Sequence, residues 1–279
     1  MKKRLVSLMV LCALGGCAVR QQAVDRLGDA IAASGSVYAS EDDPELVREA
    51  APFSLKLIES LLQESPRHPG LLLAAARGFT QYAYAFVQQE ADEAEDRDLE
   101  RAAQLQARAR GLYRRARDYG RRGLAEAPED VGLVYWTAVS TAAYIALSKH
   151  DPEALADLPQ VQDLMQRALM LDDAFDAGAV HTFMVSFLMA QPAANGHAAK
   201  SARRHFARAM ELSGGSSAAL VALAEAVCVP QQRRAEFERL LQQALELDVD
   251  RAPGLRLSNL VAQRRARWLL SRTDRLFLK

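Results

Sequence analysis

Helical periodicity is the feature that most constrains this chain. From Pro44 onward apolar residues recur with the spacing of amphipathic helices, and no segment shows the sustained apolar–polar alternation of a strand. Glycine and proline fall mostly between the periodic segments, where helices begin and end. The sequence therefore predicts an all-α domain over residues 44–279.

Several of the predicted helices end in similar phrases, which indicates a repeat. Arg167-Ala-Leu-Met-Leu-Asp172 and Gln243-Ala-Leu-Glu-Leu-Asp248 resemble the second-helix endings of tetratricopeptide units. The Trp, Gly and Tyr expected in the first helices are out of register, so the repeat is degenerate. We predict a tetratricopeptide-like stack of helix pairs, an α-solenoid, with a long insertion between the first two units.

The first residues carry the pattern of a secreted lipoprotein. A basic start, Lys2–Arg4, precedes an apolar run, Leu5–Leu14, that is too short to cross a bilayer. The following Leu14-Gly-Gly-Cys17 resembles a lipobox, in which small residues fit the peptidase and the cysteine thiol takes the lipid. We predict a signal peptide over 1–16, lipidation of Cys17 and a tether over 17–43. The alternative is a chance cysteine near an ordinary cleavage site.

The residue after the cysteine bears on location. In Gram-negative lipoproteins an aspartate there favours the inner membrane, so Ala18 favours the outer membrane. We expect a periplasmic protein held by its lipid at the inner leaflet of the outer membrane. Cleavage removes Lys2, Lys3 and Arg4 from a chain with 35 Lys and Arg against 35 Asp and Glu, which leaves a net charge near −3. That charge argues against nucleic acid as a partner.

Motifs of catalysis and cofactor binding are missing. The sequence contains no His-Glu-x-x-His, Gly-x-Ser-x-Gly, Walker-type or dinucleotide motif, so we expect neither an enzyme nor a cofactor. After cleavage and lipidation Cys228 is the remaining cysteine, so an intramolecular disulfide is excluded.

Residues 90–126 combine an acidic run with an arginine-rich helix. The carboxylates between Glu90 and Glu100 lack the spacing of a calcium loop, so we interpret them as a solvated loop and helix start without a metal. The arginines between Arg101 and Arg122 form either a solvated face with local ion pairs or a surface for an acidic partner.

Three predicted helices, residues 71–87, 131–147 and 177–190, are apolar nearly all round. Such a helix is buried on all sides, faces lipid or lines an apolar cavity. The uncharged run 131–148 reaches the lower limit for a membrane span. Hydroxyl side chains form a stripe along this helix, so we reject the span.

These helices occupy corresponding first-helix positions, which in a solenoid line one concave surface. An apolar cavity with a few hydroxyl groups is typical of a small-molecule site. The alternative is that the same side chains fill a core. The candidate cavity-lining residues are Tyr82, Tyr84, Thr137, Ser140, Thr141, Tyr144 and His181.

Three stretches carry a family resemblance. Asp42–Leu62, Gly78–Val87 and Leu112–Gly120 occur in this order behind the lipobox and look like the TatT family, the T-component lipoproteins associated with TRAP transporters. The resemblance covers most of the chain after the lipobox. It implies a periplasmic homotrimer with an apolar pore or cavity. It also implies a partner, the solute-binding P-component, which delivers organic acids or other hydrophobic ligands to a sodium-coupled permease.

Two functional hypotheses remain open. The first is an accessory lipoprotein of a TRAP transporter that handles an organic acid or other hydrophobic small molecule, which requires an accessible apolar cavity. The second is a tetratricopeptide scaffold lipoprotein of envelope assembly that binds only proteins, which requires a filled core and a polar groove. Under both hypotheses the chain contacts the membrane through its lipid anchor only.

Overall fold

The computed structural model describes residues 25–31, 35–191 and 196–278. The elements of the first half are α2 (Gly35–Ala39), α3 (Pro44–Glu64), α4 (Pro69–Tyr82), the π-helix η1 (Ala83–Gln88), α5 (Gln89–Ala94), α6 (Leu99–Glu126), α7 (Val131–Ala146), α8 (Pro152–Ala156) and α9 (Leu158–Leu171). The second half contains α10 (Phe175–Ala190), α11 (Gly196–Ser213), α12 (Ser217–Leu223), the π-helix η2 (Ala224–Cys228), α13 (Arg234–Glu246), the 3-10 turns η3 (Val249–Arg251) and η4 (Pro253–Leu255), α14 (Arg256–Ser271) and α15 (Thr273–Leu276).

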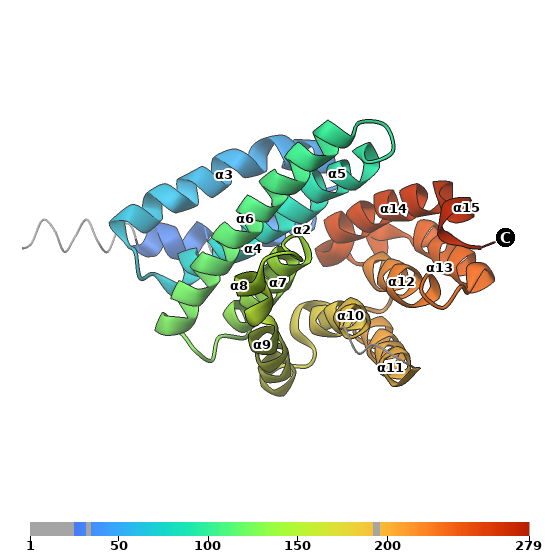
Figure 1. Cartoon of the computed structure of the whole chain (residues 1–279). Helices are drawn as coiled ribbons and strands as arrows, with labels where there is room; N and C mark the ends of the chain where they lie inside the picture. The colour runs from blue at the N-terminus through green and yellow to red at the C-terminus, as the bar shows by residue number, and fades with distance from the viewer. Residues whose placement is uncertain (1–24, 32–34, 192–195, 279) are drawn as a thin grey trace, which may run out of the picture.

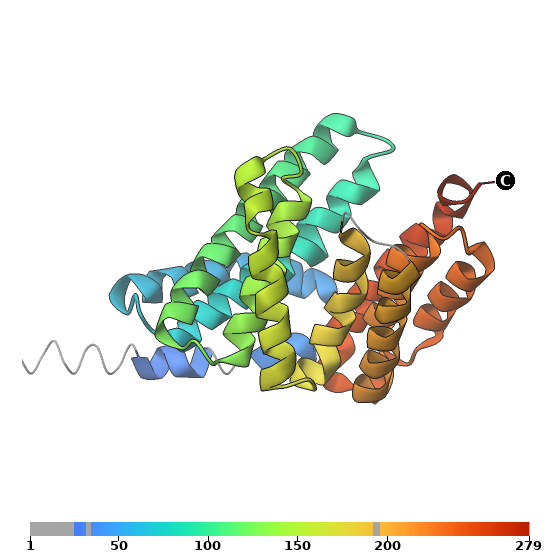
Figure 2. The ribbon, with the colours of Figure 1, turned by 60° about the horizontal axis from the view of Figure 1, so that its bottom comes forward.

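The helices follow one another in an arc, from α3 and α6 through α7–α9 and α10–α11 to α13–α15 (Figure 1). Figure 2 shows the same succession from a second side. The described residues form no strand, which confirms the predicted all-α stack.

The predicted signal peptide and Cys17 lie outside the described residues. Within the stretch predicted as a tether, α2 packs on α14 and η4.

Side-chain oxygens cap the starts of several helices. Asp43 accepts hydrogen bonds from the N–H groups of Glu45 and Leu46 at the start of α3. Asp130 caps α7 and Ser216 caps α12 in the same way. These caps satisfy N–H groups that have no partner within the helix. The helix boundaries expected from glycine and proline therefore coincide with capping residues.

Adjacent helices pack in pairs: α4 on α6, α7 on α9, α10 on α11, and α12 on α13. The sequence predicted a long insertion between the first two units, and this prediction is wrong. Helix α6 is the second member of a pair, because its buried stripe Leu105, Ala109, Tyr113 and Ala116 lies against α4 and η1. The acidic run belongs to the end of the first helix and to the turn of the same pair.

Glycines on α6 allow α7 to approach closely. A Cβ atom added to Gly120 would lie 2.3 Å from Thr137 Oγ1, and one added to Gly123 would lie 2.3 Å from Leu133 Cδ2. Both distances are far below van der Waals contact. The first two helix pairs are therefore joined by a tight interface that only glycine permits at these positions.

Buried polar side chains of α14 hold it against the two preceding helices. Asn259 Oδ1 accepts a hydrogen bond from the backbone N–H of Ser217, at 3.0 Å. Gln263 Nε2 donates to the carbonyl oxygens of Ala244 and Leu247, at 3.1 Å and 3.0 Å. Because unpaired buried polar groups are costly, these bonds favour one position of α14 over others.

The chain reverses at the start of α10 through left-handed backbone. Asp176 and Ala177 have φ of 47° and 54°, and Gly178 has φ of 83°. L-residues rarely adopt this conformation, which costs roughly 1–2 kcal/mol for each non-glycine residue. The start of α10 is thus a strained point in the arc.

No helix in the described part of the chain is both long and apolar enough to cross a membrane. Helix α7, which contains most of the uncharged run, has 16 residues and is packed between α6 and α9.

Candidate functional site

Two π-helical turns occupy similar places in the two halves of the arc. η1 continues α4, and η2 continues α12. A π turn inserts an extra residue into a helical turn, and such turns are frequent at functional sites. Tyr84 is the second residue of η1, and Glu225 is the second residue of η2.

Arg265 of α14 connects these two turns. Its guanidinium group pairs with the carboxylate of Glu225 on η2 and with that of Asp92 on α5, each at 2.5 Å. The Arg265 side chain is 11% exposed, and that of Glu225 is 40% exposed. Burial opposes the charged form of Arg265, but Glu225, Tyr84 and Asp92 together raise its pKa above the ordinary value. Arg265 is therefore a fixed positive charge at the junction of the two halves.

Tyr84 lies at the edge of this cluster. Burial raises the pKa of its phenol. The charge of Arg265 opposes this shift, and the charges of Glu225 and Asp92 add to it. Its side chain is nevertheless 44% exposed. Of the predicted cavity-lining residues, Tyr84 is the one that the structure leaves exposed. It can reach a ligand or a partner from solvent.

Further ion pairs extend the junction along α14 and α15. Arg264 forms two hydrogen bonds with the carboxylate of Glu93, at 2.9 Å and 2.7 Å. Arg272 and Arg275 both pair with Asp96, at 3.2 Å and 2.6 Å. The two ends of the arc are therefore linked by several charged contacts.

Trp268 orders the arginines of α14. The guanidinium carbon of Arg265 lies 4.2 Å from the centre of its ring, and that of Arg272 lies 4.7 Å from the same centre. Both contacts are within the range of cation–π attraction. The indole therefore holds two arginines that point toward the first half of the chain.

The acidic run is only in part the solvated loop and helix start that the sequence predicted: Glu95, Asp98 and Glu100 are exposed at the turn and the start of α6, whereas other carboxylates of the run are paired. Asp92, Glu93 and Asp96 pair with arginines of α14 and its C-terminal turn, and Glu90 pairs with Arg48 of α3. The Arg264–Glu93 partners lie 171 residues apart in the sequence. Local spacing gave no indication of these contacts, in which Asp92, Glu93 and Asp96 bind the last helices.

The arginines of α6 also act mainly within the molecule. Arg117 and Arg121 pair with Asp157, at 3.4 Å and 2.7 Å. Arg115 lies over the ring of Phe79, at 5.2 Å. These contacts join α6 to neighbouring helices, whereas the sequence predicted ion pairs within the helix; binding of an acidic partner by this face stays a prediction.

The hydroxyl stripe of α7 is buried and internally bonded. Thr137, Ser140 and Thr141 have no exposed surface. The Thr137 hydroxyl donates to the Leu133 carbonyl at 2.6 Å, and both Ser140 and Thr141 donate to the Thr137 carbonyl, at 3.1 Å and 2.6 Å. These hydroxyl groups need no ligand as a partner. A ligand-binding role for them stays a prediction, but the need for a hydrogen-bond partner no longer supports it.

Two other predicted residues have aromatic and cationic neighbours. Tyr82 is buried, with its ring 5.7 Å from that of Phe86 and its hydroxyl bonded to Arg108 at 3.4 Å. Tyr144 is partly buried, and Arg117 lies 4.7 Å from its ring centre. The structure therefore places the predicted residues in separate surroundings.

His181 forms a pair with a second histidine. Its Nδ1 atom lies 2.8 Å from Nδ1 of His205 on α11, so one ring donates a hydrogen bond and the other accepts. Burial lowers the pKa of both rings, that of His205 to about 4. The pair is therefore neutral at neutral pH and connects α10 to α11.

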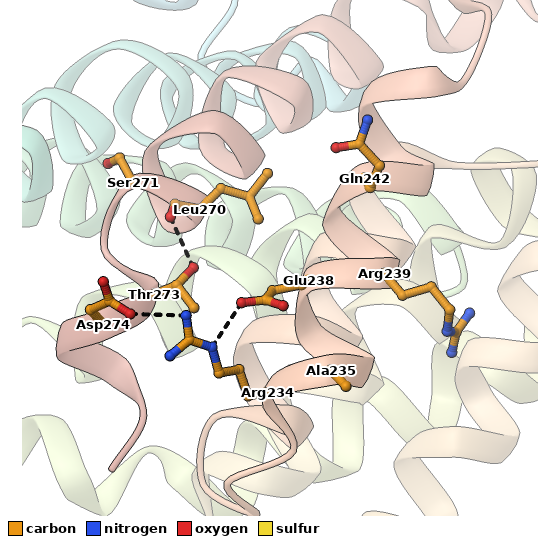
Figure 3. Close-up of a pocket in the computed structure, with 9 residues that line it drawn as sticks. All are labelled: Arg234, Ala235, Glu238, Arg239, Gln242, Leu270, Ser271, Thr273 and Asp274. Atoms are coloured by element: carbon orange, nitrogen blue, oxygen red, sulfur yellow. Dashed lines mark hydrogen bonds and ion pairs between the residues drawn. The ribbon is translucent and has the colours of Figure 1, made fainter. Parts of the chain in front are cut away.

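Two surface grooves are lined mainly by polar and charged side chains. In the groove between α13 and the end of α14, Arg234 pairs with Glu238 and with Asp274, each at 2.9 Å (Figure 3). The other groove lies beside Arg67 and His68. Neither groove includes a residue predicted to line the cavity.

Within the residues that the structure describes, no group of three or more His, Cys, Asp and Glu side chains is arranged to hold a metal ion. Cys228 is free and buried, and burial raises the pKa of its thiol to about 11. The junction offers fixed charges and aromatic rings, so the chemistry that it supports is recognition.

Comparison with protein families identifies the chain. The TRAP transporter T-component family matches residues 40–129 and 125–277. The chain belongs to this family. The relatives of this T-component include an uncharacterized protein of Treponema pallidum (strain Nichols), which is 30% identical over 268 residues, or 87% of this chain and 83% of the relative. The acidic run and the arginines of α14 lie in different matched regions, so the ion pairs join the two.

Proposed function

We propose that this T-component pairs with the solute-binding P-component of a TRAP transporter and handles a small organic acid or other hydrophobic ligand. The family match carries the proposal, because membership indicates an accessory role to a TRAP transporter. The family is one of transporter accessories and not of enzymes. The pairing and the ligand go beyond the family match.

The proposal includes a location. Lipidation of Cys17 would hold the protein in the periplasm at the inner leaflet of the outer membrane. The lipobox-like Leu14–Cys17 and the following Ala18 support this location. A homotrimer, as the TatT resemblance implies, completes the proposal.

We propose that the partner and its ligand meet the T-component at the junction around Tyr84. Tyr84 is 44% exposed, so its ring can contact a partner or a ligand, while its hydroxyl is held beside Gln89 and the charged cluster, where burial raises the pKa of the phenol. The ring supplies apolar surface beside Arg265 and Glu225, whose positions are fixed by ion pairs. The exposed ring suits the apolar body of such a ligand.

Calorimetric titration with a TRAP solute-binding P-component from the same organism tests the pairing. We expect the P-component to bind in the presence of its ligand, and Tyr84→Ala to weaken binding about tenfold or more, as loss of an aromatic contact at an interface centre does. Met170→Ala, a change of another exposed apolar side chain on α9, is the control and should leave binding unchanged. Failure of the intact protein to bind, with or without ligand, would contradict the pairing.

The scaffold hypothesis keeps specific support. The hydroxyl stripe is filled and internally bonded, and the described grooves are polar. Fluorescence of an apolar probe, N-phenyl-1-naphthylamine, separates the two hypotheses. Saturable uptake that an organic acid displaces favours ligand handling. If the folded protein takes up no probe, the result favours an envelope scaffold that binds only proteins.

A further inference from the structure

The first long helix of the stack has apolar residues on its outer face. Leu46, Phe53 and Leu57 of α3 are 53%, 74% and 40% exposed, while Val47, Leu55 and Ile58 face the core. Terminal units of a helical stack normally present a polar outer face to water.

The other end of the stack follows this rule. The outer surface of α13 presents Arg239, Gln242, Gln243 and Glu246, all exposed and polar. The apolar face of α3 therefore distinguishes one end of the arc from the other. It has the character of a surface that another molecule covers.

The spacing of this face suits a second helix. Leu46, Ala50, Phe53 and Leu57 alternate steps of four and three residues, which is the seam of a coiled coil. The helix has 21 residues and is therefore about 30 Å long. The seam from Leu46 to Leu57 covers roughly 17 Å of this length, with Pro52 near its middle, so a partner helix of about three turns would cover it.

We propose that α3 binds α3 of a second copy of this chain in antiparallel orientation. With the two-fold axis between residues 51 and 52, Leu46 faces the partner's Leu57. In the same arrangement Ala50 faces the partner's Phe53, so the largest side chain of the seam meets the smallest. The two-fold axis generates each of these contacts twice.

Charge complementarity selects the second copy over other occupants. Glu49 and Lys56 lie on the same exposed flank of the seam, and the antiparallel arrangement places Glu49 beside the partner's Lys56 on both sides of the axis. Glu49 has no ion pair in the described part of the chain. Lys56 pairs with Glu59 at 2.6 Å, but this lysine side chain is 70% exposed, so the pair is weak and can exchange.

This contact is distinct from the proposed homotrimer. An isologous helix pair closes after two copies and does not generate threefold symmetry. One helix pair is a small interface, so we expect dissociation constants on the order of micromolar to tens of micromolar. A dimer supports the inference, and so does a hexamer in which trimers pair.

A charge swap tests the arrangement in the chain with Cys17→Ser, which prevents lipidation. Sedimentation equilibrium of this chain should show two-fold association. Glu49→Lys and Lys56→Glu should each weaken it about tenfold, because each creates two like-charge contacts. The double swap should restore the dissociation constant to within about threefold of the parent, since opposite charges meet again.

Circular dichroism and melting temperature check that each variant keeps its fold, which is expected because both side chains are exposed. A monomer at roughly 100 μM overturns the inference, as this is well above the expected dissociation constant. A trimer unaffected by the single swaps, or a double swap that fails to restore association, also overturns it. In those cases the face belongs to another protein or to the lipid surface.

Discussion

Arg264 forms two hydrogen bonds with the carboxylate of Glu93, across 171 residues of sequence. Both side chains are partly buried, at 32% and 23% exposure. A paired guanidinium–carboxylate contact is directional as well as charged. The contact therefore fixes how α14 lies against α5, and the neighbouring Arg265 strengthens the same link.

Removal of the Arg265 charge should destabilise the protein more than removal of a surface charge on the same helix. Arg265→Gln leaves Asp92 and Glu225 near each other without their shared cation, so we expect a loss of about 2–3 kcal/mol in the free energy of unfolding. Arg267→Gln, at an exposed position of α14, should change it by less than ~0.5 kcal/mol. Urea unfolding measures both, and equal losses would contradict the proposed importance of the junction.

The α6–α7 interface should not tolerate a methyl group at its closest point. Gly120→Ala places a Cβ atom against Thr137, and overpacking of this kind costs about 1–3 kcal/mol. Gly111→Ala on the same helix meets nothing within 4 Å and should stabilise it by roughly 0.5–1 kcal/mol. Thermal unfolding of the two variants should shift in opposite directions. A shift in the same direction would show that α7 is not packed as described.

A substitution at the strained start of α10 should stabilise the protein. Ala177→Gly relieves a left-handed φ of 54° and should raise the free energy of unfolding by roughly 0.5–1 kcal/mol. Ala179→Gly, two residues later in the helix, should lower it by about 1 kcal/mol. Chemical denaturation distinguishes them, and a loss of stability in both variants would argue against the left-handed turn.

The histidine pair predicts a pH dependence of stability. The pKa of His205 is lowered from 6.5 to about 4, mainly by burial and then by His181 and Arg204. Between these values the unfolded chain binds a proton that the folded pair excludes, so the free energy of unfolding should fall as the pH falls from 6.5 toward 4.

The histidine contribution to this fall should be roughly 1–3 kcal/mol, and His205→Asn should flatten the profile in that window. Unfolding at a series of pH values provides the measurement. If parent and variant show parallel profiles between these limits, other groups cause the pH dependence.

The anchor has a direct test. Cys17→Ser removes the thiol that the lipid would use, and the protein should then leave the membrane fraction and appear in the soluble periplasmic fraction. A high-salt wash controls for weak adsorption through charge. Sedimentation of the washed variant with membranes would exclude lipidation as the attachment.

The fold could be predicted because its signals are local. Apolar periodicity, together with prolines and glycines at the boundaries, indicated helices. Asp43 and Asp130 cap two of these helices immediately beside such boundaries. The assignment of α6 to an insertion was wrong because the packed face of this helix is narrow. Arginines cover much of its surface, yet a narrow stripe through Leu105 and Tyr113 is enough to pack on α4.

The candidate site was less accessible to sequence reasoning. Tyr84 was selected as an aromatic residue on an apolar helix, but its neighbours Glu225 and Arg265 come from distant segments. Thr137 and its neighbours were chosen because a hydroxyl stripe suits a binding cavity, but their hydroxyl groups donate to backbone carbonyls of their own helix.

The contact between α5 and α14 changes how the stack is expected to open. In an ordinary solenoid each unit touches only its neighbours, so the ends fray independently and stability adds along the chain. Here the last long helix also supports the first pair, through Arg264 and Arg265 and through the bond from Gln89 to the Val261 carbonyl. Hydrogen exchange in α4 and in α14 should therefore report one cooperative opening event, in which the chain's beginning and end protect each other.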